Sequence, residues 1–130
     1  MEIEKKQEHD LRKEGRLRYH WPVWFAEDCE DVLIQGQMVD VSSEGAAFTC
    51  YSHDQCPLKG ERVTARFSVP KFSPDDSFDM KSFGRRAKVC RIEQINNFIN
   101  KIAVQFEEPL SFKPGEQTEN PGEMLRAVTI

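Results

Sequence analysis

The stretch VDVSSEGAAF, from Val39 to Phe48, places two hydrophobic runs on either side of a polar turn. The turn combines a carboxylate, two serine hydroxyls and a glycine. Short polar side chains satisfy the free amides of tight turns, and glycine admits backbone conformations that other residues avoid. The stretch therefore predicts a hairpin between two antiparallel strands, with more polar groups than the hairpin itself needs.

Segments of alternating polar and hydrophobic residues extend on both sides of this hairpin. The pattern is clearest in ERVTARFSVP, where Val63, Ala65, Phe67 and Val69 share one face. We expect six strands, in residues 20–26, 31–42, 45–52, 61–70, 78–95 and 97–108. Gly36 is expected to mark a bulge or bend and Gly84 a break in its strand. Six short strands in a chain of this length predict an all-β fold, a small six-stranded antiparallel β-barrel.

Size and composition agree with one globular domain. The chain has 130 residues, of which 38% are hydrophobic and 31% charged, and a formal net charge of -4. Its charged start does not resemble a signal peptide, and no apolar run approaches the roughly 20 residues that span a bilayer. We therefore expect a cytoplasmic protein with a flexible segment in residues 1–19, a barrel in residues 20–110 and an irregular tail in residues 111–130.

The two ends of the chain give weaker patterns. The first fifteen residues are polar and charge-dense, which fits either a frayed helix or a segment that stays disordered until something binds. The tail is rich in proline and glycine before EMLRAVTI. That last stretch predicts a short C-terminal helix with Asn120 as N-cap and Pro121 at its first position, or else a ragged end.

The segment RKEGRLR, residues 12–18, carries four basic residues and one acid on an otherwise acidic protein. Arginine presents a planar fork of donors that grips phosphate, or the O6/N7 edge of guanine, at two points. Arg12 and Arg16 would share one face of a helix, or would wrap around a ligand in an extended segment. Gly15 favours the extended alternative, because it disfavours a continued helix.

The polar turn offers complementary groups. The carboxylate of Asp40 can accept hydrogen bonds from the N1–H and N2–H₂ edge of guanine. If the strand extends through residues 40–42, Ser42 points to the same face as Asp40. Gly45 supplies a positive φ or a close backbone approach. Taken alone, the turn is better explained by side chains that satisfy turn amides. Combined with the arginine pair, it indicates a guanine-nucleotide site, in which Ser43 and Glu44 face solvent and contribute little.

These motifs, in this order, resemble the PilZ domain family. The resemblance lies in RxxxR at Arg12–Arg16, in Pro22-Val23, in DxSxxG at Asp40–Gly45, and in the later strands that close with VQFE. It implies a six-stranded barrel with a C-terminal helix and a bacterial receptor for cyclic di-GMP.

On that resemblance, Arg12 and Arg16 bind phosphates and guanine edges, Asp40 and Ser42 bind guanine, and Gly45 permits the turn. Many family members carry a basic residue immediately before the first arginine, where this chain has Leu11. Lys13 and Arg18 are therefore expected as auxiliary ligand-binding residues.

Other chemistry-bearing residues give no comparable pattern. The segment CYSHDQC brings Cys50, His53 and Cys56 close in sequence but offers no fourth metal ligand, so isolated free thiols are expected rather than a zinc site. Trp21, Trp24 and Phe25 could stack on bases, but alternation along the strand favours core packing for at least one face of them, and an exposed member would border the ligand site. We find no catalytic triad or paired carboxylates, so the chain is not expected to be an enzyme.

The sequence therefore predicts a cyclic di-GMP receptor or adaptor with no other cofactor and no metal. It would order its N-terminal arginine segment over the barrel and signal to an unidentified downstream protein. One alternative is a PilZ-like protein-interaction module without nucleotide binding. Another is a small barrel that binds single-stranded nucleic acid, which the acidic net charge disfavours.

Overall fold

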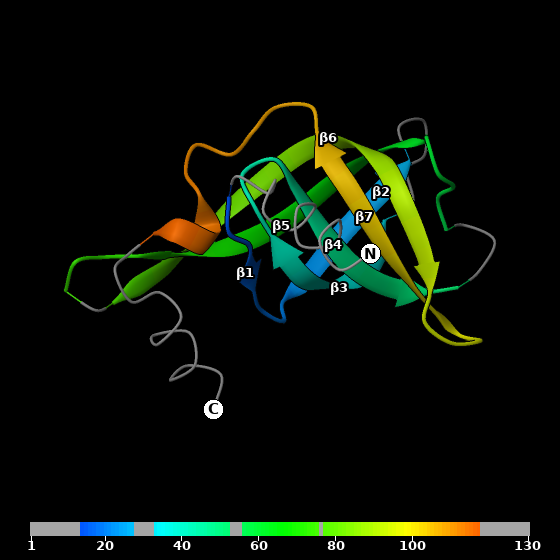
Figure 1. Ribbon diagram of the computed structural model, residues 1–130, viewed down its shortest axis with the longest axis horizontal. Helices are drawn as coiled ribbons and strands as arrows, with labels where there is room; N and C mark the ends of the chain where they lie inside the picture. The colour runs from blue at the N-terminus through cyan, green and yellow to red at the C-terminus, as the bar shows by residue number, and fades with distance from the viewer. Residues whose placement is uncertain (1–13, 28–32, 53–55, 76, 118–130) are drawn as a thin grey trace, which may run out of the picture.

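The computed structural model describes residues 14–27, 33–52, 56–75 and 77–117. Within these ranges the chain is almost entirely β-structure (Figure 1). The strands are β1 (Leu17–Arg18), β2 (Pro22–Glu27), β3 (Ile34–Val41), β4 (Gly45–Tyr51), β5 (Arg62–Phe72), β6 (Phe78–Gln94) and β7 (Ile99–Phe106). A single 3-10 turn, η1 (Pro114–Glu116), follows in the described part of the tail.

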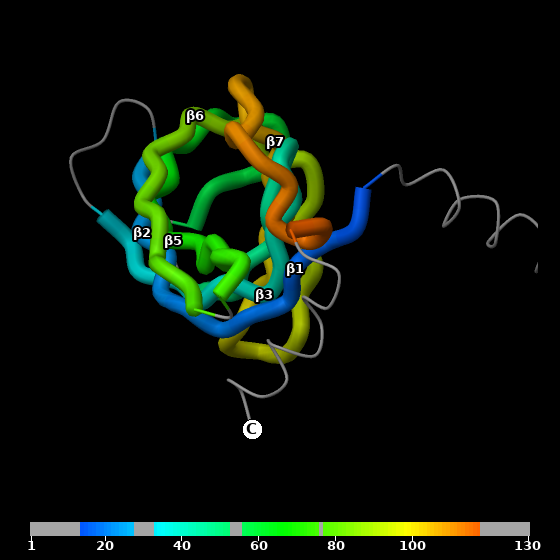
Figure 2. Tube along the Cα trace, turned by 90° about the vertical axis from the view of Figure 1, so that its left-hand side faces the viewer, coloured from blue at the N-terminus to red at the C-terminus, as the bar shows by residue number. Residues whose placement is uncertain are grey.

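Six of these strands close into a barrel, as the end-on view of Figure 2 shows. The neighbours follow the order β3-β2-β5-β6-β7-β4, and β4 pairs again with β3 to complete the ring. Every pairing is antiparallel. The predicted six-stranded antiparallel barrel is therefore confirmed, and the two-residue strand β1 is added beside β3.

The core forms because one face of each strand alternates inward. The four predicted inward residues of β5 are all buried, as are Ile102, Val104 and Phe106 of β7. Phe48 of β4 lies at the centre with its ring centroid 4.8 Å from that of Phe25. Burial of a side chain of this size contributes about 1.5–3 kcal/mol relative to exposure, so this pair helps to fix the register of the strands that carry it.

The expectations for Gly36 and Gly84 were wrong. The register shifts between Met38 and Asp40 and between Val89 and Arg91, so the irregular residues are Val39 and Cys90. Gly36 instead allows a close approach, because a Cβ there would lie 2.6 Å from a backbone oxygen of β4. Strand β6 continues through Gly84, where a Cβ would meet open space.

Of the three aromatic residues in and beside β2, Phe25 packs in the core, as expected for at least one face of them. Trp21 and Trp24 are 46% and 43% exposed. Val23 and Phe25, the neighbours of Trp24 along β2, take the inward positions and are fully buried. Alternation along the strand then turns Trp24 outward.

Both ends of the chain reach beyond the described residues. Residues 14–19 contact the barrel, with Leu17 and Tyr19 buried in its core cluster. The expected helix after Asn120 lies outside the described residues. In the described part of the tail, η1 contacts β1 and β5. No helix among the described residues is long and apolar enough to cross a membrane.

Candidate functional site

The hairpin between β3 and β4 is closed by its own backbone. The Ser42 N–H donates to the Gly45 carbonyl at 2.8 Å, and the Ser42 hydroxyl accepts from the Glu44 N–H at 3.3 Å. The Ser42 side chain therefore does what serine does in ordinary turns. Gly45 is required for close approach rather than for a positive φ, since an added Cβ would collide with the Val104 carbonyl of β7.

Ser43 was expected to face solvent, and that expectation was wrong. Its side chain is 8% exposed, and its hydroxyl and backbone N–H both donate to the Glu14 carboxylate, at 2.6 and 2.7 Å. Its carbonyl accepts from the Leu110 N–H at 2.7 Å. Ser43 is thus the point where the segment before β1 and the segment after β7 meet the hairpin. Glu44 is exposed, as expected.

Arg16 and Asp40 form an ion pair beside this turn. Arg16 Nη1 lies 2.8 Å from Asp40 Oδ1, and the two side chains are 35% and 14% exposed. The pairing of β1 with β3 explains the contact, because Arg18 lies opposite Asp40 and Leu17 opposite Val41 in the ladder. Since Val41 is fully buried, Asp40 points outward toward the arginine-bearing segment.

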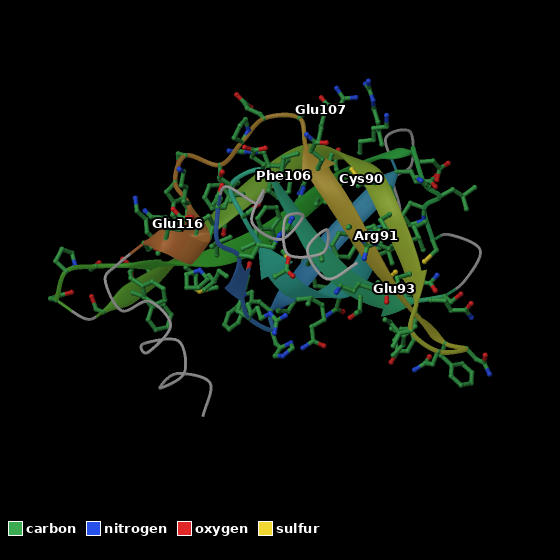
Figure 3. All side chains as sticks on the ribbon, viewed as in Figure 1. Cys90, Arg91, Glu93, Phe106, Glu107 and Glu116 are labelled. Carbon is green, nitrogen blue, oxygen red and sulfur yellow. The ribbon has the colours of Figure 1, made fainter. Side chains whose placement is uncertain are left out.

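A second contact attaches the same segment to the tail. The Gly15 N–H donates to Glu116 Oε2 at 2.6 Å. The backbones of the segment before β1 and of η1 are so close that a Cβ on Gly115 would lie 2.5 Å from the Gly15 carbonyl oxygen. Residues 14–16 therefore bridge the hairpin turn of the barrel, through Glu14, and the 3-10 turn of the tail, through Gly15. Figure 3 labels Glu116 on η1, which Figure 2 shows beside β1.

Arg16 stands between two hollows in the surface. The first has a volume of about 470 Å³ and is lined by Glu14, Ser42, Gly45 and Gln105, among others. The second has a volume of about 340 Å³. The two share Arg16 and Ala103 in their linings, so they form neighbouring parts of one surface over β1, β3, β4, β6 and β7.

The second hollow is rich in positive charge. Its lining contains four basic residues and two acids, namely Arg16, Arg18, Arg91, Lys101, Asp40 and Glu93. This local excess of two positive charges contrasts with the net charge of -4 for the whole chain. Such a surface attracts a small anion.

Sequence reasoning missed Arg91 and Lys101. They come from β6 and β7, where Arg91 pairs with Ala103 and Lys101 with Glu93. Figure 3 shows Arg91 and Glu93 along the same strand as Cys90. Two basic residues on neighbouring strands of a β-hairpin could have indicated an anion-binding surface. Their position beside Arg16 could not be read from the sequence, because it depends on the pairing of β4 with β3 that closes the barrel.

The structure brings together four of the five predicted ligand-binding residues. Arg16, Asp40, Ser42 and Gly45 lie around the two hollows, and the auxiliary residue Arg18 lines the second. The fifth residue, Arg12, lies outside the described residues, as does Lys13.

Comparison with known proteins gives the family of the chain. The model of the PilZ domain matches residues 10–119. A search of the curated proteins finds no match. The chain therefore belongs to the PilZ domain family, a family of cyclic di-GMP-binding domains.

Two solved structures share the fold. One is the Bacillus subtilis inhibitor of motility, MotI/DgrA, with a TM-score of 0.57 and 16% identity over 91% of this chain and 51% of that one. The chain thus spans about half the length of that protein. The other is the PilZ domain of CeSA from a cellulose-synthesizing bacterium, with a TM-score of 0.51 and 16% identity over 88% of this chain and 95% of that one.

Proposed function

We propose that this chain is a bacterial, cytoplasmic receptor for cyclic di-GMP that binds its ligand over the two hollows beside Arg16. The observation that carries the proposal is the Arg16–Asp40 ion pair, which stands between the hollows and directly beside the hairpin turn. Arg12 would join this site from the segment that precedes Glu14.

The two partners of the ion pair suit the two ends of a guanine nucleotide. A carboxylate accepts from the N1–H and N2–H₂ edge of guanine, and a guanidinium grips phosphate oxygens or the O6/N7 edge. Arg16 and Asp40 satisfy each other at 2.8 Å. The ligand would exchange that contact for two of the same kind, so neither charge would be left unpaired.

The basic hollow would carry the phosphate charge. Arg18, Arg91 and Lys101 line it together with Arg16. They offer positive charge near the motif even though Leu11 stands where many family members have a basic residue. We propose that they balance the charge of the bound phosphates, and that their number influences how many ligand molecules bind.

The output of this receptor would be a change in the segment before β1. Glu14 and Gly15 hold this segment to Ser43 and Glu116. A ligand that recruits Arg12 and Arg16 would rearrange these contacts and so present a different surface to a downstream protein. Reordering of a segment by a ligand is a common way to control a protein interaction.

Calorimetric titration with cyclic di-GMP tests the proposal. Arg16→Ala and Asp40→Ala should each weaken binding by roughly 1–3 kcal/mol, the scale of charge-assisted hydrogen bonds. Arg62→Ala is the matched control, because Arg62 belongs to an exposed ion pair that does not line either hollow. Absence of binding at high micromolar protein, or equal affinity in all three variants, would overturn the proposed site.

One observation favours the alternative of a protein-interaction module. Trp21 and Trp24 flank a hollow of about 620 Å³ whose lining includes Arg66, Phe83 and Gly84. Exposed tryptophans are enriched at protein interfaces. Trp24→Ala should leave the titration with cyclic di-GMP unchanged if this surface serves output alone, whereas a chain that binds no nucleotide at all would support the alternative.

A further inference from the structure

Two cysteine sulfurs meet at the end of β4. Cys50 Sγ lies 3.2 Å from Cys56 Sγ. This is shorter than the roughly 3.5–4.0 Å of an ordinary non-bonded carbon contact. Isolated thiols were expected, and for this pair that expectation was wrong.

Several contacts fix the position of the two thiols. Cys56 Sγ donates to the Tyr51 carbonyl at 3.3 Å, and Asn100 Nδ2 donates to Cys56 Sγ at 3.9 Å. Asn100 is also the register partner of Cys50 in the β4–β7 ladder. These contacts therefore hold Cys56 against β4 and β7, the same strands that position Cys50.

The third described cysteine has a different environment. Cys90 Sγ lies near the Lys88 carbonyl at 3.5 Å and Gln105 Oε1 at 4.0 Å, on the side of the barrel that carries the proposed nucleotide site. Cys50 and Cys56 are thus the thiol pair that the described part of the chain brings into contact.

A small reagent can approach this pair. Cys56 is partly exposed, whereas Cys50 is buried. A hollow of about 440 Å³ opens on Cys50 and is lined also by Gly36, Thr49 and Ile99. The partly exposed Cys56 sulfur is therefore placed to react first with a reagent from solvent, and the buried Cys50 sulfur to react second.

We propose that Cys50 and Cys56 form a redox modification site, which peroxide converts reversibly into an intramolecular disulfide. In the first step, the Cys56 sulfur takes an oxygen atom from hydrogen peroxide, which gives a sulfenic acid and one water. In the second, the Cys50 sulfur attacks the Cys56 sulfur, the S–S bond forms, and the hydroxyl leaves with the Cys50 proton as a second water. The two thiols lose two electrons and two protons, and one peroxide becomes two waters.

The short distance favours the second step over competing reactions. Burial, with the neighbouring Cys56, raises the pKa of the Cys50 thiol from 9.0 to about 12, so its thiolate is scarce near neutral pH. Placement of the two sulfurs in contact offsets this scarcity, because it makes the attack intramolecular. A disulfide needs the sulfurs at about 2.0 Å, so they must approach by roughly a further 1.2 Å.

The disulfide would staple the connection between β4 and β5 to the barrel. Its ring would run from Cys50 to Cys56, a short loop that includes Tyr51 and Ser52 of the described residues. A cross-link stabilises a fold chiefly by restricting the unfolded chain, and a short ring does so modestly. We expect the melting temperature to rise by about 5 °C on oxidation.

Peroxide treatment of the full chain, followed by mass spectrometry, tests the proposal. The intact mass should fall by about 2 Da and the titratable thiols should fall from four to two. A peptide that joins Cys50 to Cys56 should appear in the non-reduced digest and disappear with dithiothreitol, which should also restore the original melting temperature.

Two variants keep the outcome clear. Cys56→Ser should abolish the mass loss, whereas Cys90→Ser should retain it with the same kinetics, because Cys90 is not part of the pair. A cross-link that instead contains Cys29 or Cys90 would overturn the proposal. So would oxidation of Cys56 to sulfinic acid while Cys50 remains a free thiol.

Discussion

Two ion pairs on the same barrel differ in almost every respect that matters for function. Arg16 Nη1 and Asp40 Oδ1 lie 2.8 Å apart, and their side chains are 35% and 14% exposed. Arg62 Nη1 and Glu107 Oε2 lie 3.7 Å apart, and theirs are 61% and 40% exposed. The first pair stands between two hollows, whereas the second lines neither.

This difference distinguishes a candidate ligand-binding site from ordinary surface charge. An exposed pair gains little, because water and salt screen its attraction and two long side chains lose freedom. The Arg16–Asp40 pair is less exposed and is held by the β1–β3 ladder and by the hairpin turn. Disruption of the turn, of buried titratable groups in the core or of either pair should therefore have effects of different size.

The largest effect is expected at the turn that positions Asp40. In Gly45→Ala the new Cβ would collide with the Val104 carbonyl of β7, a backbone atom that cannot swing aside. Overpacking of this kind costs roughly 1–3 kcal/mol of unfolding free energy. Gly84→Ala is the matched control, since its Cβ would meet nothing within 4 Å. Urea denaturation should show a clear loss for Gly45→Ala and little change for Gly84→Ala; similar losses in both would contradict the close approach.

Alkaline pH should destabilise the fold through buried neutral groups. Burial raises the pKa of Tyr19, whose hydroxyl donates to the Ser68 carbonyl at 2.7 Å, and it raises that of Cys50 to about 12. A group with a raised folded pKa contributes stability that is present below its unfolded pKa and is lost as pH rises toward the folded value. The losses should begin near the ordinary values of 9.0 for Cys50 and 10.0 for Tyr19.

Thermal denaturation measured at steps from pH 8 to pH 12 checks this expectation. Stability should fall across the range, and Tyr19→Phe should fall less steeply above pH 10, because it removes one of the groups that titrate. An equally steep fall in Tyr19→Phe would mean that the alkaline loss has another origin.

The strands were predictable because their information is local. Alternation places Val63, Ala65, Phe67 and Val69 inward whatever the rest of the chain does. Alternation does not say which face of a strand is inward when both faces carry aromatic residues. Strand β2 shows this, since Phe25 is buried and Trp24 is exposed. That choice depends on the neighbouring strands.

The candidate site was predictable where it consists of short motifs and unpredictable where distant segments meet. Asp40, Ser42 and Gly45 are close in sequence, so one turn brings them together. The burial of Ser43 depends on Glu14, which precedes it by 29 residues. The position of Lys101 in the lining of the second hollow depends likewise on the pairing of β7 with β4, which local sequence does not specify. Such contacts arise from topology, which local patterns do not contain.

Replacement of Glu14 should have an effect of intermediate size, which lowers the stability of the fold and raises the affinity for the ligand. Its carboxylate holds Ser43 and lines the same hollow as Arg16. Glu14→Gln should cost about 0.5–1.5 kcal/mol of unfolding free energy, the net value of an ordinary hydrogen bond. It should also bind cyclic di-GMP a few-fold more tightly, because a negative charge no longer faces an anionic ligand.

The control for this variant is Glu107→Gln, which changes the net charge equally at a residue that lines neither hollow. Titration of both variants should show tighter binding for Glu14→Gln alone. Equal gains would assign the effect to overall charge, and a loss in Glu14→Gln would mean that its carboxylate supports the bound state.

The smallest effect is expected at the exposed pair itself, where the comparison of the two ion pairs is tested most directly. Glu107→Gln should change the unfolding free energy by less than about 0.5 kcal/mol, the value typical of exposed pairs. Asp40→Asn should cost about 1 kcal/mol, because its pair is shorter and less exposed. Urea denaturation at low and at high salt measures both effects. High salt should reduce the small effect of Glu107→Gln toward zero and leave most of the effect of Asp40→Asn. Equal costs that disappear together in salt would make the Arg16–Asp40 contact ordinary surface charge, and would remove the observation on which the proposed nucleotide site depends.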